Sequence, residues 1–193
     1  STGFFNTPGV LLTNAVIFSF GGSHLELGEH MLCKEYFPNS NLQMRGDLRD
    51  AMISYYDFLV AYQNLLRDGG NINSPDLSCI TLHIPMNNWP PQSGKVSVTG
   101  RDMGNMQVIH LINFSSATSL LWRDNSGTQA VPVTFTKVKM TFKTDKTVKK
   151  VWVASPDLNS GTPEELEISS AAGSVSFTLP DLKYWDMIVV EYQ

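Results

Sequence analysis

The sequence has few cysteines, few charged residues and no long apolar run, and each shortage excludes a class of protein. Two of the 193 residues are cysteine, which is too few for a disulfide scaffold. Their positions, Cys33 and Cys79, lack the CxxC spacing of zinc and redox sites, and their redox state stays open. No stretch of eighteen apolar residues occurs, so we expect no membrane-spanning helix.

Basic charge is also scarce. Lysine and arginine number 14 against 18 acidic residues, which gives a net charge of -4. Because binding to phosphates requires a basic surface, nucleic acid is not an expected partner. The first residues, from Ser1 onward, have neither the basic nor the apolar segment of a signal peptide. We therefore expect a globular chain that is long enough for a sizeable core.

Common catalytic and metal-binding motifs are missing too. The histidines show no HExxH spacing and no pairing with CxxC, and no phosphate-binding or EF-hand loop is present. Ser23 follows two glycines, but the pattern is not G-x-S-x-G. His110 lies inside an apolar run and is expected to be structural. The sequence thus implies no metal ion and no cofactor.

Composition changes near residue 76, which indicates two parts. Residues 1–76 hold four basic and eight acidic side chains, whereas the rest holds ten of each and all four tryptophans. In the first part, Thr7-Pro8 is typical of an N-cap followed by proline at the first helical position, and Gly21-Gly22 suits a helix end. The run 10–20 between them favours a helix, although its β-branched residues leave a strand as the alternative.

A strand and a second helix are expected next. Residues 23–27 alternate polar and apolar side chains, and a long loop reaches residue 46. Residues 47–68 predict one helix, with Asp47 as N-cap and two glycines as its stop. Its apolar stripe consists of Leu48, Met52, Tyr55, Leu59, Tyr62 and Leu66. This order is typical of an α/β domain with parallel strands, and because one strand is no sheet, we expect further strands upstream of Ser1.

The second part predicts an antiparallel β-sandwich, after a linker-like segment at 69–75. Short alternating runs are separated by turn signals, as in that architecture. The runs are residues 95–99, 106–114, 131–142, 148–154, 174–179 and 187–192.

Strand geometry singles out two polar residues of the first part. In a strand at 23–27, His24 and Glu26 point to one side and the two leucines to the other. In a parallel barrel the leucines would pack under helices, so His24 and Glu26 would face the lumen. Glu26 would then lie near the carboxyl end of the strand, where such barrels place their sites, with the loop 28–46 over the same face. The alternative is a structural polar pair.

Several runs resemble glycoside hydrolase family 66, which comprises dextranases and cycloisomaltooligosaccharide glucanotransferases. They are residues 12–29, 33–39, 55–62, 64–68, 108–114, 150–157 and 184–188. The resemblance implies a catalytic (β/α)8 barrel followed by a C-terminal β-sandwich. Residues 1–76 would be the last helix–strand–helix portion of the barrel plus a linker, and residues 77–193 the sandwich.

The resemblance also implies the chemistry. That family cleaves internal α-1,6 linkages of dextran with retention, through an aspartate nucleophile and a glutamate acid/base. Both come from barrel strands that precede this chain, so we expect a fragment that is inactive alone and holds no catalytic residue. Asn14 resembles a substrate-binding asparagine of the family, and would lie at the top of the barrel if the first helix started near Thr13.

Three functions remain open at this stage. The main one is part of a retaining endo-dextranase, and the second is part of a cycloisomaltooligosaccharide glucanotransferase. The third is a non-catalytic sugar-binding sandwich with Trp89 as an exposed stacking platform, while Trp152 and Trp185 are expected in the core. The expected partners are α-1,6-glucans (dextran and isomaltooligosaccharides) and the upstream barrel segment. An extracellular or periplasmic location follows from a polymer too large to cross membranes.

Overall fold

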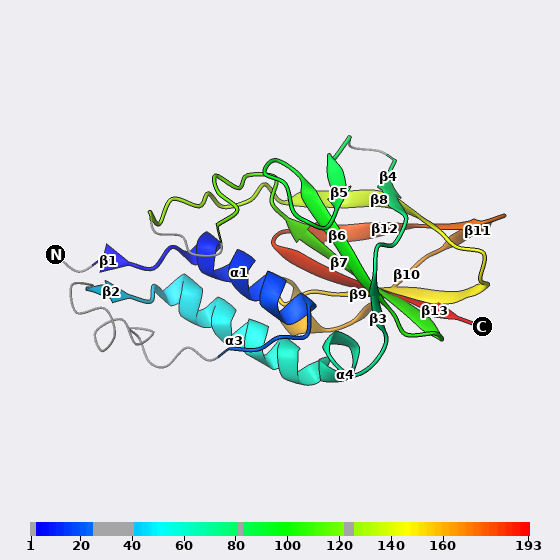
Figure 1. Cartoon of the computed structure of the whole chain (residues 1–193), viewed down its shortest axis with the longest axis horizontal. Helices are drawn as coiled ribbons and strands as arrows, with labels where there is room; N and C mark the ends of the chain where they lie inside the picture. Colours follow the sequence, from blue (N-terminus) through cyan, green and yellow to red (C-terminus); the bar gives the residue numbers. More distant parts are fainter. Residues whose placement is uncertain (1–2, 25–40, 81–82, 122–125) are drawn as a thin grey trace.

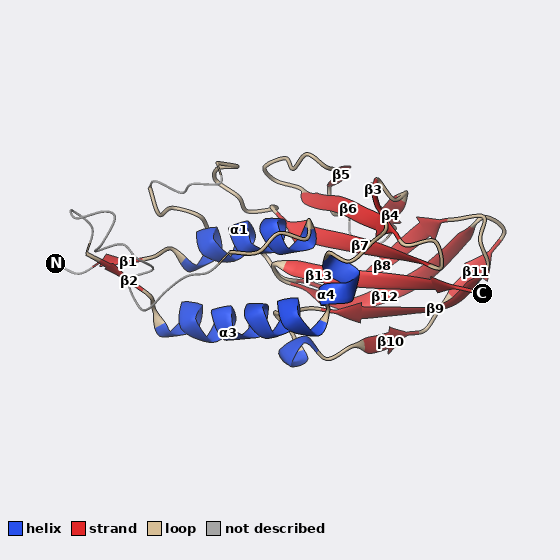
Figure 2. Cartoon of the chain, turned by 60° about the horizontal axis from the view of Figure 1, so that its bottom comes forward, coloured by secondary structure: helices blue, strands red, loops and turns tan. Residues whose placement is uncertain are grey.

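The computed structural model describes residues 3–24, 41–80, 83–121 and 126–193 (Figure 1). Two long helices lie side by side at one end, and two sheets stacked as a sandwich occupy the rest (Figures 1 and 2). Both helices start at the end of the molecule that is far from the C terminus. None of the described helices is long and apolar enough to cross a membrane.

Helix α1 (Thr7–Ser19) confirms the predicted helix and excludes the strand alternative. Its N-cap is Asn6, whose side-chain oxygen accepts a hydrogen bond from the Gly9 amide at 2.7 Å, so the expected cap at Thr7 is wrong by one residue. At the other end, Gly21 has φ +82°, and the amides of Gly21 and Gly22 bond carbonyls of the last helical turn. The helix therefore does not start near Thr13.

The second predicted helix is split in two. Helix α3 spans Gly46–Ala61 and α4 spans Gln63–Leu66, with a non-helical residue, Tyr62, between them. The Tyr62 hydroxyl donates to the Gly161 carbonyl at 2.6 Å, a contact across 99 residues that no local pattern reveals. Asp47 lies in the first turn of α3 rather than at its N-cap, which is Arg45.

A short parallel pair precedes the helices. Strand β1 (Gly3–Phe4) pairs with β2 (Leu42–Gln43), and a helix follows each strand. Ser23 and His24 belong to no strand, and the rest of the strand predicted at 23–27 lies outside the described residues. The described residues thus follow the order β1-α1-β2-α3, in which the sequence did not predict the strand before α3.

The larger sheet has seven strands in the order β10-β9-β13-β7-β6-β3, with β5 also paired to β6. They are β3 (Asn71–Asn73), β5 (Met86–Asn88), β6 (Val96–Asp102), β7 (Met106–Asn113), β9 (Val148–Ala154), β10 (Glu164–Leu166) and β13 (Trp185–Tyr192). Every pairing is antiparallel except that of β5 with β6. The segment expected to be a linker therefore supplies β3, an edge strand.

The smaller sheet has four strands in the order β11-β12-β8-β4, all antiparallel. They are β4 (Leu77–Cys79), β8 (Phe135–Lys143), β11 (Ser169–Ala171) and β12 (Ser174–Leu182). A 3-10 turn, η1 (Asn159–Gly161), faces α3. Cys79 is a half-buried free thiol, and Cys33 lies outside the described residues.

Two hydrophobic cores give the molecule three layers. One core lies between the two sheets, and the other joins the helices to the opposite face of the larger sheet. Trp185 is fully buried in the helix-side core, as expected, whereas Trp152 is half-buried at its margin. The two compositional parts of the chain therefore share a core.

One carboxylate ties the helical layer to the sandwich. Asp157 accepts hydrogen bonds from the Tyr55 hydroxyl at 2.8 Å and from the backbone amides of Tyr184 and Trp185 at 3.0 and 2.8 Å. Burial raises the pKa of Asp157, and these hydrogen bonds oppose that rise. Burial, followed by the charge of Asp157, also raises the pKa of Tyr55 well above its usual value, so Tyr55 remains a donor.

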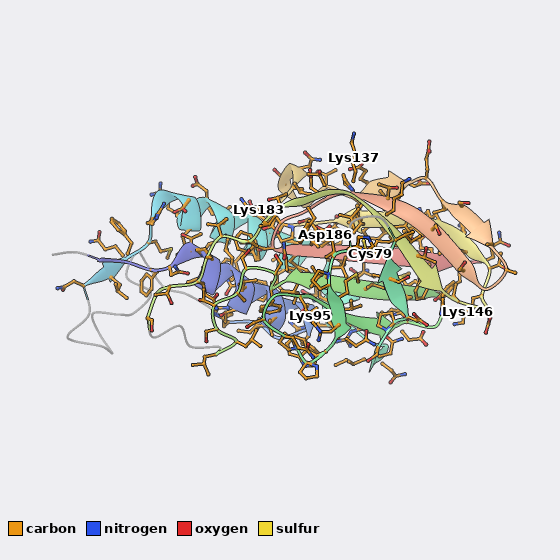
Figure 3. The ribbon with its side chains drawn as sticks, turned by 90° about the horizontal axis from the view of Figure 1, so that it is seen from above. Cys79, Lys95, Lys137, Lys146, Lys183 and Asp186 are labelled. Atoms are coloured by element: carbon orange, nitrogen blue, oxygen red, sulfur yellow. The ribbon has the colours of Figure 1, made fainter. Side chains whose placement is uncertain are left out.

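A second carboxylate, Asp186, is fully buried near the start of β13, at the helix-bearing end of the sandwich (Figure 3). Among the described residues no group donates a well-formed hydrogen bond to either of its oxygens, because the nearby Ser155 hydroxyl donates to the Trp185 carbonyl at 2.6 Å. Burial, and then the charge of Asp157, raise the pKa of Asp186 well above its ordinary range. The folded chain therefore favours the neutral, protonated form of this side chain.

Asp157→Ala is expected to lower the free energy of unfolding by about 3 kcal/mol or more, because it strands three donors in a buried site. Tyr55→Phe, which removes one of the three bonds, should cost about 1–2 kcal/mol. Urea unfolding of the 193-residue chain measures both. Asp145→Ala, in an exposed turn, is the matched control, and a loss for Asp157→Ala no larger than for this control would contradict the role.

The contribution of Asp186 to the stability of the chain is expected to fall as pH rises above the unfolded-state pKa of aspartate, whereas His110, with its pKa lowered to about 3, contributes a slope of the opposite sign below about pH 6.5. The raised pKa of Asp186 means that the folded state holds its proton more tightly, so stability is full at low pH and is lost as pH rises through the folded-state pKa. Asp186→Asn should remove the contribution of Asp186, so that the stability of the variant falls less, or rises more, with pH than the stability of the parent chain. Urea midpoints between pH 4 and 8 measure it, and equal slopes in both proteins would refute the assignment.

Candidate functional site

Two of the three predicted sugar-contacting residues lie in direct contact. The His24 Nε2 donates to the side-chain oxygen of Asn14 at 2.6 Å. Asn14 sits in the middle of α1, where its side-chain nitrogen faces the Met52 sulfur of α3 at 3.3 Å. Asn14 is 0% exposed, and both ends of its amide are engaged. Asn14 thus does not lie at the start of the helix, because that helix begins at Thr7.

His24 is held from both helices. The Tyr56 hydroxyl, from α3, donates to the His24 carbonyl at 3.1 Å. The ring of Phe18, from α1, lies 5.6 Å from the His24 ring and 5.8 Å from that of Tyr56. His24 is half-buried, and the chain after it, including Glu26, lies outside the described residues. The contacts fix both the ring and the backbone of His24.

A hollow of about 360 Å³ lies where β1 and β2 end and the two long helices begin. Its lining comprises Phe4, Phe5, Asn6, Thr7, Pro8, Leu11, Arg45, Asp47, Ala51, Gly127, Val131, Lys183 and Tyr184. The carboxyl ends of parallel strands are the usual place for ligands in α/β folds. Sequence reasoning missed this hollow, since its walls come from four separate segments. The predicted helix start at Thr7-Pro8 was the only local signal.

The hollow has mainly apolar walls, with a few polar side chains at their edge. Both ends of the Asn6 side-chain amide are hydrogen-bonded within the chain. Its oxygen caps α1, and its nitrogen donates to the Gly127 and Gln129 carbonyls at 3.0 and 3.1 Å. Arg45 and Asp47 form an exposed ion pair at 3.1 Å. Burial, with the charge of Asp157 and then of Asp47, raises the pKa of Tyr184 to about 12. The Tyr184 phenol therefore keeps its proton and can donate a hydrogen bond at neutral pH.

Three buried titratable side chains of the described residues, His110, Asp157 and Asp186, lie away from solvent. Burial, and then the nearby Arg101, lower the pKa of His110 to about 3, and its Nδ1 accepts a bond from the Trp185 indole at 3.1 Å. The Asp157 carboxylate accepts three hydrogen bonds from within the chain, and Asp186 has no exposed surface. A retaining glycosidase pair must instead face its substrate. Within the described ranges, no three His, Cys, Asp or Glu side chains gather to hold a metal ion.

The predicted stacking platform is not an open one. Trp89 is half-buried, and its ring packs edge-on against Phe20 with centroids 4.7 Å apart. Together with the buried Trp185, this leaves little exposed tryptophan surface among the described residues.

Comparisons with known proteins agree on one family. The family model "Glycosyl hydrolase family 66" matches residues 2–189. Two cycloisomaltooligosaccharide glucanotransferases of Niallia circulans are 33% and 34% identical to this chain, each over 98% of it. The chain spans only 20% of the length of either relative.

A solved structure gives the same result. It is the cycloisomaltooligosaccharide glucanotransferase of Paenibacillus sp., complexed with cycloisomaltoheptaose. It superposes on 97% of this chain with a TM-score of 0.85 and 28% identity, and the match covers 27% of that protein. The family resemblance noted in the sequence is therefore confirmed along nearly its whole length: this chain belongs to glycosyl hydrolase family 66.

Proposed function

We propose that this chain is the closing part of a family 66 enzyme that acts on α-1,6-glucans outside the cytoplasm, in an extracellular or periplasmic setting. The observation that carries the proposal is the match of 98% of the chain to two glucanotransferases. The related structure with bound cycloisomaltoheptaose supports a sugar of this class. Because the chain spans a fifth of its relatives, the activity belongs to the complete polypeptide.

The β1-α1 and β2-α3 order supports a place at the end of a (β/α)8 barrel for the helical part of the chain, with the sandwich starting at β3 (Asn71–Asn73) rather than at residue 77. Both strands run parallel and each precedes a helix, as in the units of such a barrel. Here the two helices also pack on the sandwich. The nucleophilic aspartate and the acid/base glutamate are then supplied by the barrel strands outside this chain. The buried carboxylates described here are engaged in packing.

The reaction has two outcomes that share a first step. An aspartate attacks the anomeric carbon while a glutamic acid protonates the leaving oxygen, which gives a covalent glycosyl–enzyme. Attack by water completes hydrolysis, as in a dextranase. Attack by the 6-hydroxyl at the other end of the same glucan chain gives a cyclic product instead. The names of the relatives favour the second outcome.

We further propose that His24 and Glu26 contribute to the glucan-binding surface and that Asn14 acts through His24. Asn14 has no exposed surface, so a sugar hydroxyl does not reach it in this packing. Its oxygen instead orients the His24 ring at 2.6 Å. Asn14 is thus a positioning residue, and His24 is the group that meets the sugar.

A sugar-binding role for the sandwich alone has less support. The tryptophans that would serve as platforms, Trp89, Trp152 and Trp185, are half-buried or buried. The sandwich instead anchors the helices through Asp157. Retardation of the 193-residue chain in a dextran gel would favour this alternative.

The complete enzyme, incubated with dextran, is expected to release cyclic isomaltooligosaccharides, which are lighter by one water than linear ones of equal length. Mass spectrometry of the products decides between transfer and hydrolysis. Linear products alone would assign a dextranase, and no product of either kind would overturn the proposed substrate. The 193-residue chain alone should release nothing.

Asn14→Ala and His24→Ala in the complete enzyme are each expected to lower kcat/KM on the order of tenfold. When a substrate-binding group is displaced, the substrate is no longer held in the orientation that the reaction requires. If Asn14 acts only through His24, the double variant should be no worse than His24→Ala. Losses that multiply would contradict this coupling. Glu26→Ala should slow cleavage with the fold intact, and Asn64→Ala, on the exposed side of α4, is the control.

A further inference from the structure

Met52 determines which way the side-chain amide of Asn14 points. The side-chain nitrogen of Asn14 lies 3.3 Å from the Met52 sulfur, and the two residues are buried, at 0% and 5% exposed. A thioether sulfur accepts hydrogen bonds but has no hydrogen to donate. The NH2 group of Asn14 therefore faces Met52, because the reverse orientation would set two acceptors against each other in a site without solvent.

The orientation of the amide in turn decides which ring nitrogen of His24 carries the hydrogen. With its NH2 group turned to Met52, Asn14 presents its oxygen to the His24 Nε2 at 2.6 Å. An oxygen acceptor requires a hydrogen on Nε2, and a neutral imidazole ring carries only one such hydrogen. The neutral ring is therefore the Nε2–H tautomer, in which Nδ1 holds the lone pair.

The contact between Asn14 and His24 does not select this tautomer by itself. If the amide were reversed, its NH2 group would donate to Nε2, the ring hydrogen would lie on Nδ1, and the two side chains would still share one hydrogen bond. The ring of Phe18, at 5.6 Å, and the Tyr56 hydroxyl, which donates to the His24 carbonyl, do not distinguish the two ring nitrogens. The acceptor-only sulfur of Met52 favours one of the two arrangements.

We propose that Met52 is a positioning residue of the glucan site, which acts through Asn14 to hold His24 in the Nε2–H tautomer so that Nδ1 accepts a hydrogen bond from a sugar hydroxyl. The inference rests on the proposed contact between His24 and α-1,6-glucans. A sugar hydroxyl can donate as well as accept. The tautomer therefore fixes the direction of this hydrogen bond, and with it the orientation in which the hydroxyl is bound.

The tautomer is measured by NMR on the 193-residue chain with 15N-labelled histidine, at a pH where the ring is neutral. Two-bond 1H–15N correlations distinguish the ring nitrogen that carries hydrogen from the one with the lone pair, and His24→Gln identifies the signals of His24. We expect the Nε2–H tautomer in the unmodified chain and a mixture of both tautomers in Met52→Leu. The Nδ1–H tautomer in the unmodified chain would overturn the proposal whether or not the variant folds. An unchanged tautomer in folded Met52→Leu would do the same.

In the complete enzyme, Met52→Leu is expected to raise KM for isomaltooligosaccharides about threefold or more with kcat nearly unchanged, because a hydrogen bond to the bound sugar is weakened throughout the reaction. Leucine nearly conserves the volume of methionine. The matched control is Met187→Leu, in the same core, since the described residues provide no hydrogen-bond donor to the Met187 sulfur. Equal changes in KM for both variants would assign the effect to packing and overturn the positioning role. A shifted tautomer with unchanged KM would instead uphold the action of Met52 on His24 and refute the proposed contact of His24 with the glucan.

Discussion

The position of the helices depends on the buried carboxylate of Asp157. It joins the Tyr55 hydroxyl of α3 to two backbone amides at the start of β13. Removing such a group from water is costly, and three donors around it are what make the burial tolerable. Because Met52 and Tyr56 lie on the same helix, this contact also sets where they meet Asn14 and His24. The sandwich thereby influences the geometry of the Asn14–His24 pair through the helices that it anchors.

Local signals predicted the longer elements but neither their limits nor the short strands. Pro8, the paired glycines and the three-and-four spacing found both long helices, and alternation found the longer sandwich strands β6, β7, β8, β9, β12 and β13, since each signal depends on neighbours in sequence. The break at Tyr62 depends on Gly161, which is 99 residues away. Strands β1 and β2 contain two residues each, too few for any alternation to register. The choice of Asn6 over Thr7 as cap depends on Asn6 also bonding the 127–129 segment.

The candidate site shows the same division. Strand geometry selected His24 and family resemblance selected Asn14, and the structure brings the two into contact at 2.6 Å. Neither argument predicted that Asn14 would be buried, because burial is set by packing against Met52 on a different helix. The sequence did not predict the hollow at the helix starts for a related reason: its lining residues, such as Arg45 and Lys183, lie far apart in the sequence. Residue types can be read from sequence, whereas their convergence requires the fold.

The residues that carry the family resemblance in the sandwich have a packing role rather than a chemical one. The runs 150–157 and 184–188 supply Asp157 and the two amides that bind it. They also supply Trp185, whose ring packs on Tyr55 and Phe58 at centroid distances of 6.0 and 4.9 Å. The contacts of Asp157 hold the helices in place whether the acceptor of the glycosyl group is a sugar hydroxyl or water. Resemblance in this region therefore identifies the family, while the choice between water and a sugar hydroxyl as acceptor has to be made at the catalytic carboxylates.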